Sequence, residues 1–284
     1  MFFLGLAAAI VAAIMFNAGV ALQALEARKA PKSLSLKVGI IGHLLRRPLW
    51  LLGSVLGIAG IGPQIVALAW APFAVVQTAL TAGLALLLFV AVRYLGERVD
   101  ALAIAGVALL VGGVALVSWG APVGAEKHRG LLAPVIVVGA TAAIAFAPFM
   151  ARRFGESQGF LLAVSAGVGF AGANIATKLA SDDVGLRHWA QAAGWAVVLV
   201  VLGVCATITS MSAIQRAAAT MVIPVSTAVQ TFVPIVLEPL FLHEHYTSLW
   251  TQVLPVAAGT LVAVGGVALV GREQAVADLA AGRR

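Results

Sequence analysis

The sequence predicts an all-α protein, a polytopic membrane bundle of about nine transmembrane helices. Of the 284 residues, 62% are hydrophobic and only 10% are charged, whereas about 25% of the residues of a soluble domain are charged. A hydrocarbon core about 30 Å thick needs roughly 20 apolar residues for each helical crossing. Runs of that length fill most of this chain, so most of its residues are expected in lipid.

Nine apolar spans are predicted, and proline marks the start of three of them. Pro48 precedes the second span, Pro72 opens the third and Pro134 lies in the first turn of the fifth, where the missing amide hydrogen costs no helical hydrogen bond. The first span is too long for a cleavable signal peptide, and no Lys or Arg precedes it. The predicted spans are residues 2–25, 49–69, 72–92, 100–119, 131–150, 159–180, 191–212, 219–241 and 249–270.

Lys and Arg predict the orientation, because cytoplasmic loops carry an excess of both. With the N-terminus outside, only Lys127, Arg129, Lys178 and Arg187 fall outside, and the other fourteen lie inside. We therefore expect a plasma (cell) membrane protein with its N-terminus outside and its C-terminus in the cytoplasm. The basic segment 26–47 is expected to anchor this topology, and contact with anionic lipid headgroups is the alternative.

The hexapeptide GGVALV occurs at residues 112–117 and again at 265–270, a shift of 153 residues. Upstream, Glu97 aligns with Glu244 at a shift of 147. Spans one to four then match spans six to nine. The predicted units are a first four-helix repeat (1–119), a connecting fifth helix with its loops (120–158) and a second repeat with a short cytoplasmic tail (159–284).

The connecting fifth helix makes the second repeat an inverted copy of the first. Inverted repeats are typical of secondary transporters, in which one half rocks against the other around a site near the bilayer midplane. Within each hexapeptide the paired glycines are expected to pack helices closely.

Several segments carry a family resemblance. The segment ALAWAPFAVVQTAL, the LGER at residues 95–98 and the glycine-rich helix that follows resemble the drug/metabolite transporter (EamA-like) superfamily. LGLAAAIVAAIMFNAGVALQALEARKA and RRPLWLLGSVLG most resemble its NIPA-like branch, which is associated with magnesium. The resemblance implies an alternating-access transporter whose cargo is a divalent cation such as Mg²⁺. A transporter of a small organic metabolite and a non-transporting membrane protein are the alternatives.

Glu238 is the first candidate for the cargo site and for a metal ligand. It is the one acidic residue well inside a predicted span, and a charge at that depth costs about 2.5–3.5 kcal/mol on insertion scales. The alternative is that its side chain snorkels to the outer interface. Its predicted helix contains three prolines, whose freed carbonyls are tolerated only against protein or water. Thr227 and Thr231 share its helical face.

Further candidates are polar side chains in the middle of predicted spans. An unpaired amide in hydrocarbon is costly, so each must face a partner or water. Gln64 stands beside Pro63 at a predicted helix break, and its repeat counterpart is a hydroxyl-rich segment. Interhelical hydrogen bonding is the alternative role for all of them. The proposed substrate-binding set is Glu238, Gln64, Gln77, Asn17, Asn174, Thr227, Gln230, Thr231 and Ser210.

Other functional classes find little support. GVGFAG at residues 167–172 has the letters of a dinucleotide fingerprint but lies in an apolar span without a preceding strand. No combination of nucleophile, base and orienting group indicates an enzyme, and no cofactor is implied. The net charge is +7, but the charged residues lie between apolar runs. This distribution does not indicate nucleic-acid binding. The expected partners are the bilayer and a small solute or Mg²⁺ as cargo, and the oligomeric state, including a homodimer, stays open.

Overall fold

A computed structural model of the chain describes residues 2–71, 73–95, 99–120, 131–150, 158–237 and 248–280. These residues form helices joined by turns and contain no strand, which confirms the predicted all-α membrane fold. Seven described helical segments are long and apolar enough to cross a bilayer. Two shorter apolar helices, Thr78–Tyr94 and Ala219–Pro234, coincide with the third and eighth predicted spans, so the count of nine crossings stays a prediction.

The first part of the chain follows the predicted spans closely. Pro48 occupies the first turn of its helix, and the predicted interruption of the second span lies at Gly60, between two helices. The elements are α1 (Phe2–Lys29), η1 (Lys32–Leu34), α2 (Gly39–Leu44), α3 (Pro48–Ala59), α4 (Ile61–Trp70), α5 (Phe73–Ala82), α6 (Leu84–Val90), the π-helical turn η2 (Ala91–Leu95) and α7 (Ala101–Gly120).

The second part is built from fewer, longer helices. The hydroxyl-rich segment predicted to correspond to the Gly60 interruption, residues 207–211, lies within a continuous helix, and α11 continues through Pro224 and Pro234. The elements are α8 (Leu132–Met150), α9 (Gln158–Gly185), α10 (Trp189–Ile214), α11 (Ala219–Leu237), the π-helical turn η3 (Leu249–Val253) and α13 (Leu254–Ala280).

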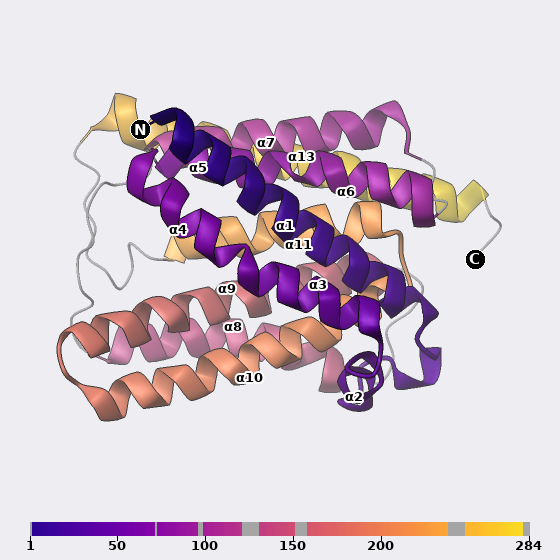
Figure 1. Cartoon of the computed structure of the whole chain (residues 1–284), viewed down its shortest axis with the longest axis horizontal. Coiled ribbons are helices and arrows are strands. Elements are labelled where there is room, and N and C mark those ends of the chain that lie inside the picture. The colour runs from indigo at the N-terminus through magenta and orange to yellow at the C-terminus, as the bar shows by residue number, and fades with distance from the viewer. Residues whose placement is uncertain are drawn as a thin grey trace.

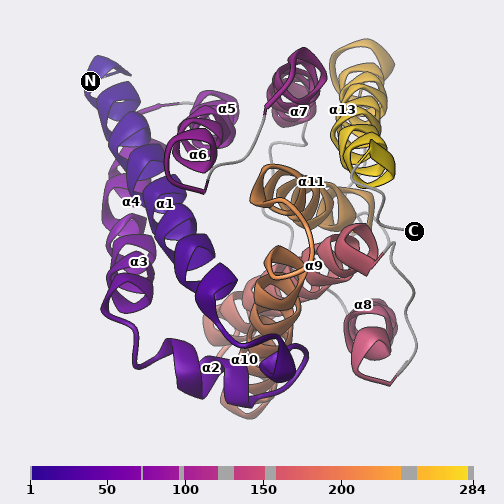
Figure 2. The same ribbon diagram turned by 90° about the vertical axis from the view of Figure 1, so that its right-hand side faces the viewer.

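The helices run side by side between two ends of the bundle (Figure 1). Helix α1 begins at the left end in this view, and α13 finishes at the right, as an odd number of crossings requires. We call the right end, where α1 finishes and α3 begins, the basic end, because most of the described cations lie there. The left end, where α9 turns into α10, is the opposite end. Viewed along the bundle, α11 lies near its centre (Figure 2).

Buried apolar side chains join the two parts of the chain at the basic end. One hydrophobic cluster there unites residues from α1, α2, α3, α6 and α7 with residues from α9, α10, α11 and α13. Toward the opposite end the clusters separate. One contains only residues of α1, α4 and α5 with Ala71, and another consists of α8, α9 and α10 with Leu237 at its edge. Figure 1 shows α4 and α9 far apart at that end.

Helices α7 and α13 hold the two parts together along their length, and both copies of GGVALV lie in this contact. A Cβ atom added at Gly113 would stand 2.6 Å from the carbonyl oxygen of Gly259. One added at Gly266 would stand 2.6 Å from the carbonyl oxygen of Gly106. The next pair along the seam is Gly120 with Gln252. As residue numbers rise on one helix they fall on the other, so the helices are antiparallel.

Candidate transport path and the contact that closes one end

Helix α9 has a polar window in its middle. Among the side chains described between Leu162 and Asp183, only Asn174 and Thr177 are exposed. They are three residues apart and therefore lie on one helical face. The exposed side of α10, by contrast, carries Val197, Val200 and similar apolar residues, as a lipid-facing helix does. Figure 2 shows α8, α10 and α11 around α9, with α1 and α3 of the first part across the bundle from it.

Helix α11, which packs against α9, carries a second polar stripe. Thr227, Gln230 and Thr231 are all half-buried, and their spacing of three and one places them on one face. The hydroxyl of Thr231 donates to the backbone oxygen of Thr227 at 2.8 Å, and its oxygen can still accept a hydrogen bond. We call Asn174, Thr177, Thr227, Gln230 and Thr231 the polar face of α9 and α11.

Asn17 differs from the exposed Asn174, because the side-chain amide of Asn17 is buried and hydrogen-bonded within the protein. It is buried in α1 and donates through Nδ2 to the backbone oxygens of Ala13 at 2.9 Å and Leu80 at 3.3 Å. Gly83, which separates α5 from α6, makes room for this amide, because an added Cβ would collide with Asn17 Nδ2. Asn17 therefore clamps α1 to the bend in the third predicted span.

The remaining predicted site residues are dispersed. Gln64 lies half-buried on α4, and its side chain makes no hydrogen bond to any described residue. Ser210 lies in a stretch of α10, residues 208–214, that is wholly buried. Gln77 belongs to α5, but its side chain lies outside the described residues, as does Glu238 altogether. The structure thus places Asn174 and the three α11 residues on neighbouring helices, and it places Asn17 on α1 and Gln64 on α4.

At the basic end, two loops are joined by hydrogen bonds that link residues far apart in sequence. We call this the loop contact, between residues 30–36 after α1 and residues 212–217 at the end of α10. The backbone amide of Leu36 donates to Ser212 Oγ at 2.8 Å. Gln215 Nε2 donates to the oxygen of Ala30 at 3.1 Å, and Arg216 Nη2 donates to Ser35 Oγ at 3.0 Å.

The loop contact holds Leu36 in an unfavourable backbone conformation. Its φ of 57° is in the left-handed region, where a branched or bulky residue is rare and the strain is of order 1–3 kcal/mol. Such strain persists only where surrounding contacts impose it. The Leu36–Ser212 hydrogen bond and the cluster against which Leu36 packs supply those contacts.

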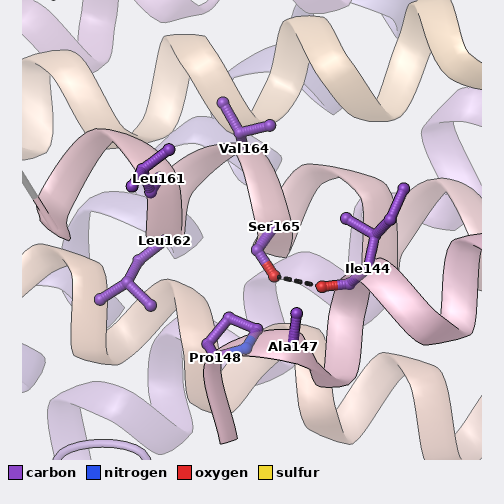
Figure 3. Close-up of a pocket in the computed structure, with 7 residues that line it drawn as sticks. All are labelled: Ile144, Ala147, Pro148, Leu161, Leu162, Val164 and Ser165. Atoms are coloured by element: carbon purple, nitrogen blue, oxygen red, sulfur yellow. Dashed lines mark hydrogen bonds between the residues drawn. The ribbon is translucent and has the colours of Figure 1, made fainter. Parts of the chain in front are cut away.

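A cavity of about 190 Å³ lies between α8 and α9 and is almost entirely apolar. Its one polar side chain, Ser165, donates from Oγ to the backbone oxygen of Ile144 at 3.1 Å (Figure 3). That oxygen would normally accept from residue 148, which is proline and has no amide hydrogen. Ser165 therefore satisfies the backbone, and the cavity offers a solute no free polar group.

Asp182 and Asp183, at the opposite end, each lie close to a basic side chain nearby in the sequence. Lys178 Nζ lies 2.9 Å from Asp182 Oδ1, and His188 Nδ1 lies 3.4 Å from Asp183 Oδ1. Within the described ranges, no three His, Cys, Asp or Glu side chains are grouped so as to hold a metal ion. Glu238, the predicted metal ligand, is outside those ranges.

Sequence reasoning did not select Thr177 or the loop contact. Thr177 could have been found, because it is three residues from Asn174 on the same helix. The partners of the loop contact could not, since Ser35 and Arg216 are ordinary loop residues until the fold brings them together. Comparison of the chain with protein-family models, with curated proteins and with solved structures finds no match.

Proposed function

We propose that this protein is an alternating-access membrane transporter whose cargo moves along the polar face of α9 and α11. The observation that carries the proposal is the exposure of Asn174 and Thr177 in the middle of α9, where every other described side chain is buried or half-buried. An amide exposed to hydrocarbon at that depth would be costly, so water or a polar solute is the favoured neighbour.

The packing supports one conformation of such a cycle. The shared hydrophobic cluster and the loop contact close the basic end, while α1, α4 and α5 form a cluster separate from that of α8, α9 and α10 at the opposite end. A carrier open toward the opposite end has this arrangement. Opening the basic end would require the loop contact to break.

The α7–α13 contact supports the proposed inverted repeats. At the shift of 153 residues, Gly106 corresponds to Gly259 and Gly113 to Gly266. The observed pairs are Gly106 with Gly266 and Gly113 with Gly259. Gly106 therefore meets the counterpart of Gly113, and Gly113 meets the counterpart of Gly106. A two-fold axis produces this self-complementary pattern, and an axis in the membrane plane relates inverted repeats.

The charge distribution supports the proposed orientation in the cell membrane. Of the ten Lys and Arg residues whose side chains are described, eight lie at the basic end, at residues 28, 29, 32, 37, 46, 47, 93 and 216. Lys178 and Arg187 lie at the opposite end, where Asp182 and Asp183 balance them. Under the positive-inside rule the basic end is cytoplasmic, so the N-terminus lies outside and the open end of the transporter faces the exterior.

The leading cargo is a divalent cation such as Mg²⁺, and the alternative is a small organic solute. Mg²⁺ keeps several of its waters and is commonly held by one or two carboxylates. Glu238 would supply the carboxylate, and Asn174 and Gln230 would contact the retained waters. The polar face favours the organic alternative equally, because its amides and hydroxyls both donate and accept hydrogen bonds.

Flux into proteoliposomes tests the proposal. Purified protein is reconstituted with an entrapped magnesium-sensitive dye, and saturable Mg²⁺ entry above that of empty liposomes is the expected result. Asn174→Leu should reduce entry at least tenfold without loss of folded protein. Val197→Ala, a matched change at an exposed apolar position of α10, should leave entry unchanged. Equal flux in all three proteins would refute the assignment of the polar face.

Glu238→Gln separates the two cargoes. For a cation carrier this change removes the charge that binds cargo or a coupling proton, so flux should be abolished while insertion is normal. Wild-type Mg²⁺ flux in this variant would show that Glu238 only snorkels to the interface. Absence of Mg²⁺ flux in the wild type, with flux of a neutral polar solute, would establish the organic alternative.

A non-transporting membrane protein is the second candidate, and the clamp at Asn17 favours it. In that case every mid-span polar group should be paired internally and no water should reach the polar face. A membrane-impermeant thiol reagent applied to Asn174→Cys, in a Cys205→Ser background, distinguishes the two. Labelling supports the transporter, and protection under all conditions supports the non-transporting protein.

A further inference from the structure

The segment that joins α1 to α3 carries cations that are not committed to any acidic partner. Lys32, Lys37 and Arg46 are exposed and form no ion pair within the described part of the chain. The nearby carboxylate of Glu26 is already engaged, 2.8 Å from Lys29 Nζ and 3.9 Å from Arg47 Nε. Asp100, the other acidic residue at the basic end whose side chain is described, accepts a hydrogen bond from the amide of Ala103.

Two of these cations stand beside exposed apolar side chains. Val38, next to Lys37, is 74% exposed, and Leu45, next to Arg46, is 50% exposed. Between them α2 turns Ile40 and Leu44 into the core, where both are fully buried. The segment is therefore anchored to the bundle on one side. Its other side presents apolar groups flanked by positive charges.

This surface lies at the level at which a membrane helix bundle meets lipid headgroups. Helix α1 finishes there and α3 begins there. The segments Phe3–Lys29 and Pro48–Ala67, which contain these helix ends, are each long and apolar enough to cross a bilayer. Apolar side chains at that depth can enter the acyl region, while Lys and Arg interact with phosphates of anionic lipids.

We propose that segment 28–47 is a binding site for anionic phospholipid. Lys32, Lys37 and Arg46 bind the headgroup, and Val38 and Leu45 contact the acyl chains. The proposal goes beyond transport and does not depend on it. It is also distinct from the topological role of loop charges, which acts during insertion and requires no lipid selectivity in the folded protein.

A lipid titration in detergent tests the proposal on the full-length chain. Short-chain phosphatidylglycerol, short-chain phosphatidylcholine and inorganic phosphate are each added to purified protein in a neutral detergent, and thermal unfolding is followed. We expect saturable stabilisation by phosphatidylglycerol alone. Each cation near an anionic surface contributes about 1 kcal/mol, equivalent to about fivefold in affinity. The triple variant Lys32→Gln/Lys37→Gln/Arg46→Gln should therefore raise the half-saturating concentration at least tenfold.

The matched control removes three cations from the other connecting segments, in Lys127→Gln/Arg129→Gln/Arg187→Gln. Its half-saturating concentration should equal that of the wild type. Equal effects of the two triple variants would overturn the proposal, as would equal stabilisation by phosphatidylcholine or by phosphate. If the first triple variant does not fold, Lys32→Gln alone should raise the midpoint about fivefold, and an unchanged midpoint in that variant would also count against the site.

Discussion

Gly113 and Gly259 meet backbone to backbone across the α7–α13 contact, since the carbonyl oxygen of each lies 2.6 Å from the position that a Cβ atom on the other would take. No side chain fits between them. Such close approach increases dispersion contacts between helices in a bilayer, where the hydrophobic effect does not drive their association. At these two glycines, the first and second parts of the chain are therefore joined by close van der Waals packing.

Substitution of Gly113 by alanine should destabilise the protein by about 1–3 kcal/mol, because the new methyl group must push two backbones apart. Gly112→Ala is the matched control. A Cβ atom added at position 112 would have no neighbouring atom within 4 Å, and alanine favours the helix by about 0.5–1 kcal/mol over glycine. Thermal unfolding in detergent measures both, and equal midpoints for the two variants would contradict the assigned packing.

Asn17→Ala should lower the free energy of unfolding by about 1–2 kcal/mol, because it removes the interhelical hydrogen bond from the Asn17 amide to the backbone oxygen of Leu80. Asn174→Ala should change it by less than about 0.5 kcal/mol, as expected at an exposed position. Denaturant unfolding of the reconstituted protein provides the comparison. A larger loss at Asn174 than at Asn17 would reverse the roles of the two amides.

Ser212→Ala should loosen the loop contact, because the amide of Leu36 loses its acceptor while the strain at its φ of 57° remains. A loss of about 1.4 kcal/mol would make hydrogen exchange at residues 30–38 about tenfold faster. Ser210→Ala is the control on the same helix, since Ser210 makes no side-chain hydrogen bond to any described residue. Unchanged exchange in the Ser212 variant would show that the contact carries no stability.

Ser165 and Pro148 should be energetically coupled through the backbone oxygen of Ile144. Ser165→Ala should cost about 1 kcal/mol in the wild type, because that oxygen then has no donor. In a Pro148→Ala background the helix supplies its own amide, so the same change should cost less. A double-mutant cycle on thermal stability measures the difference, and additive effects would exclude the proposed compensation.

Much of the helical framework could be predicted from the sequence. The spans follow from the length of the apolar runs, and Gly60 interrupts the second span where GIGPQ predicts a break. The prolines are less informative. Pro48 marks a helix start, whereas Pro224 and Pro234 lie within the continuous helix α11, because a membrane helix can tolerate a missing hydrogen bond when its neighbours compensate.

The roles of the candidate site residues were harder to predict from the sequence than the helices were. Asn17 and Asn174 are the same residue type in the middle of long apolar helices, and nothing in their local sequences distinguishes them. Asn17 is paired because α5 bends at Gly83 beside it. Asn174 is exposed because the helices around α9 cover its other faces.

By itself, the sequence determined that this chain is a bundle of apolar helices with its charge concentrated at one end. Hydrocarbon admits only segments that satisfy their own backbone hydrogen bonds, and composition reveals such segments directly. Only the tertiary structure decided which glycine of each GGVALV copy touches another helix, which asparagine clamps the fold and which loops close the basic end. These outcomes depend on neighbours distant in sequence, whose approach is set by packing rather than by any local pattern.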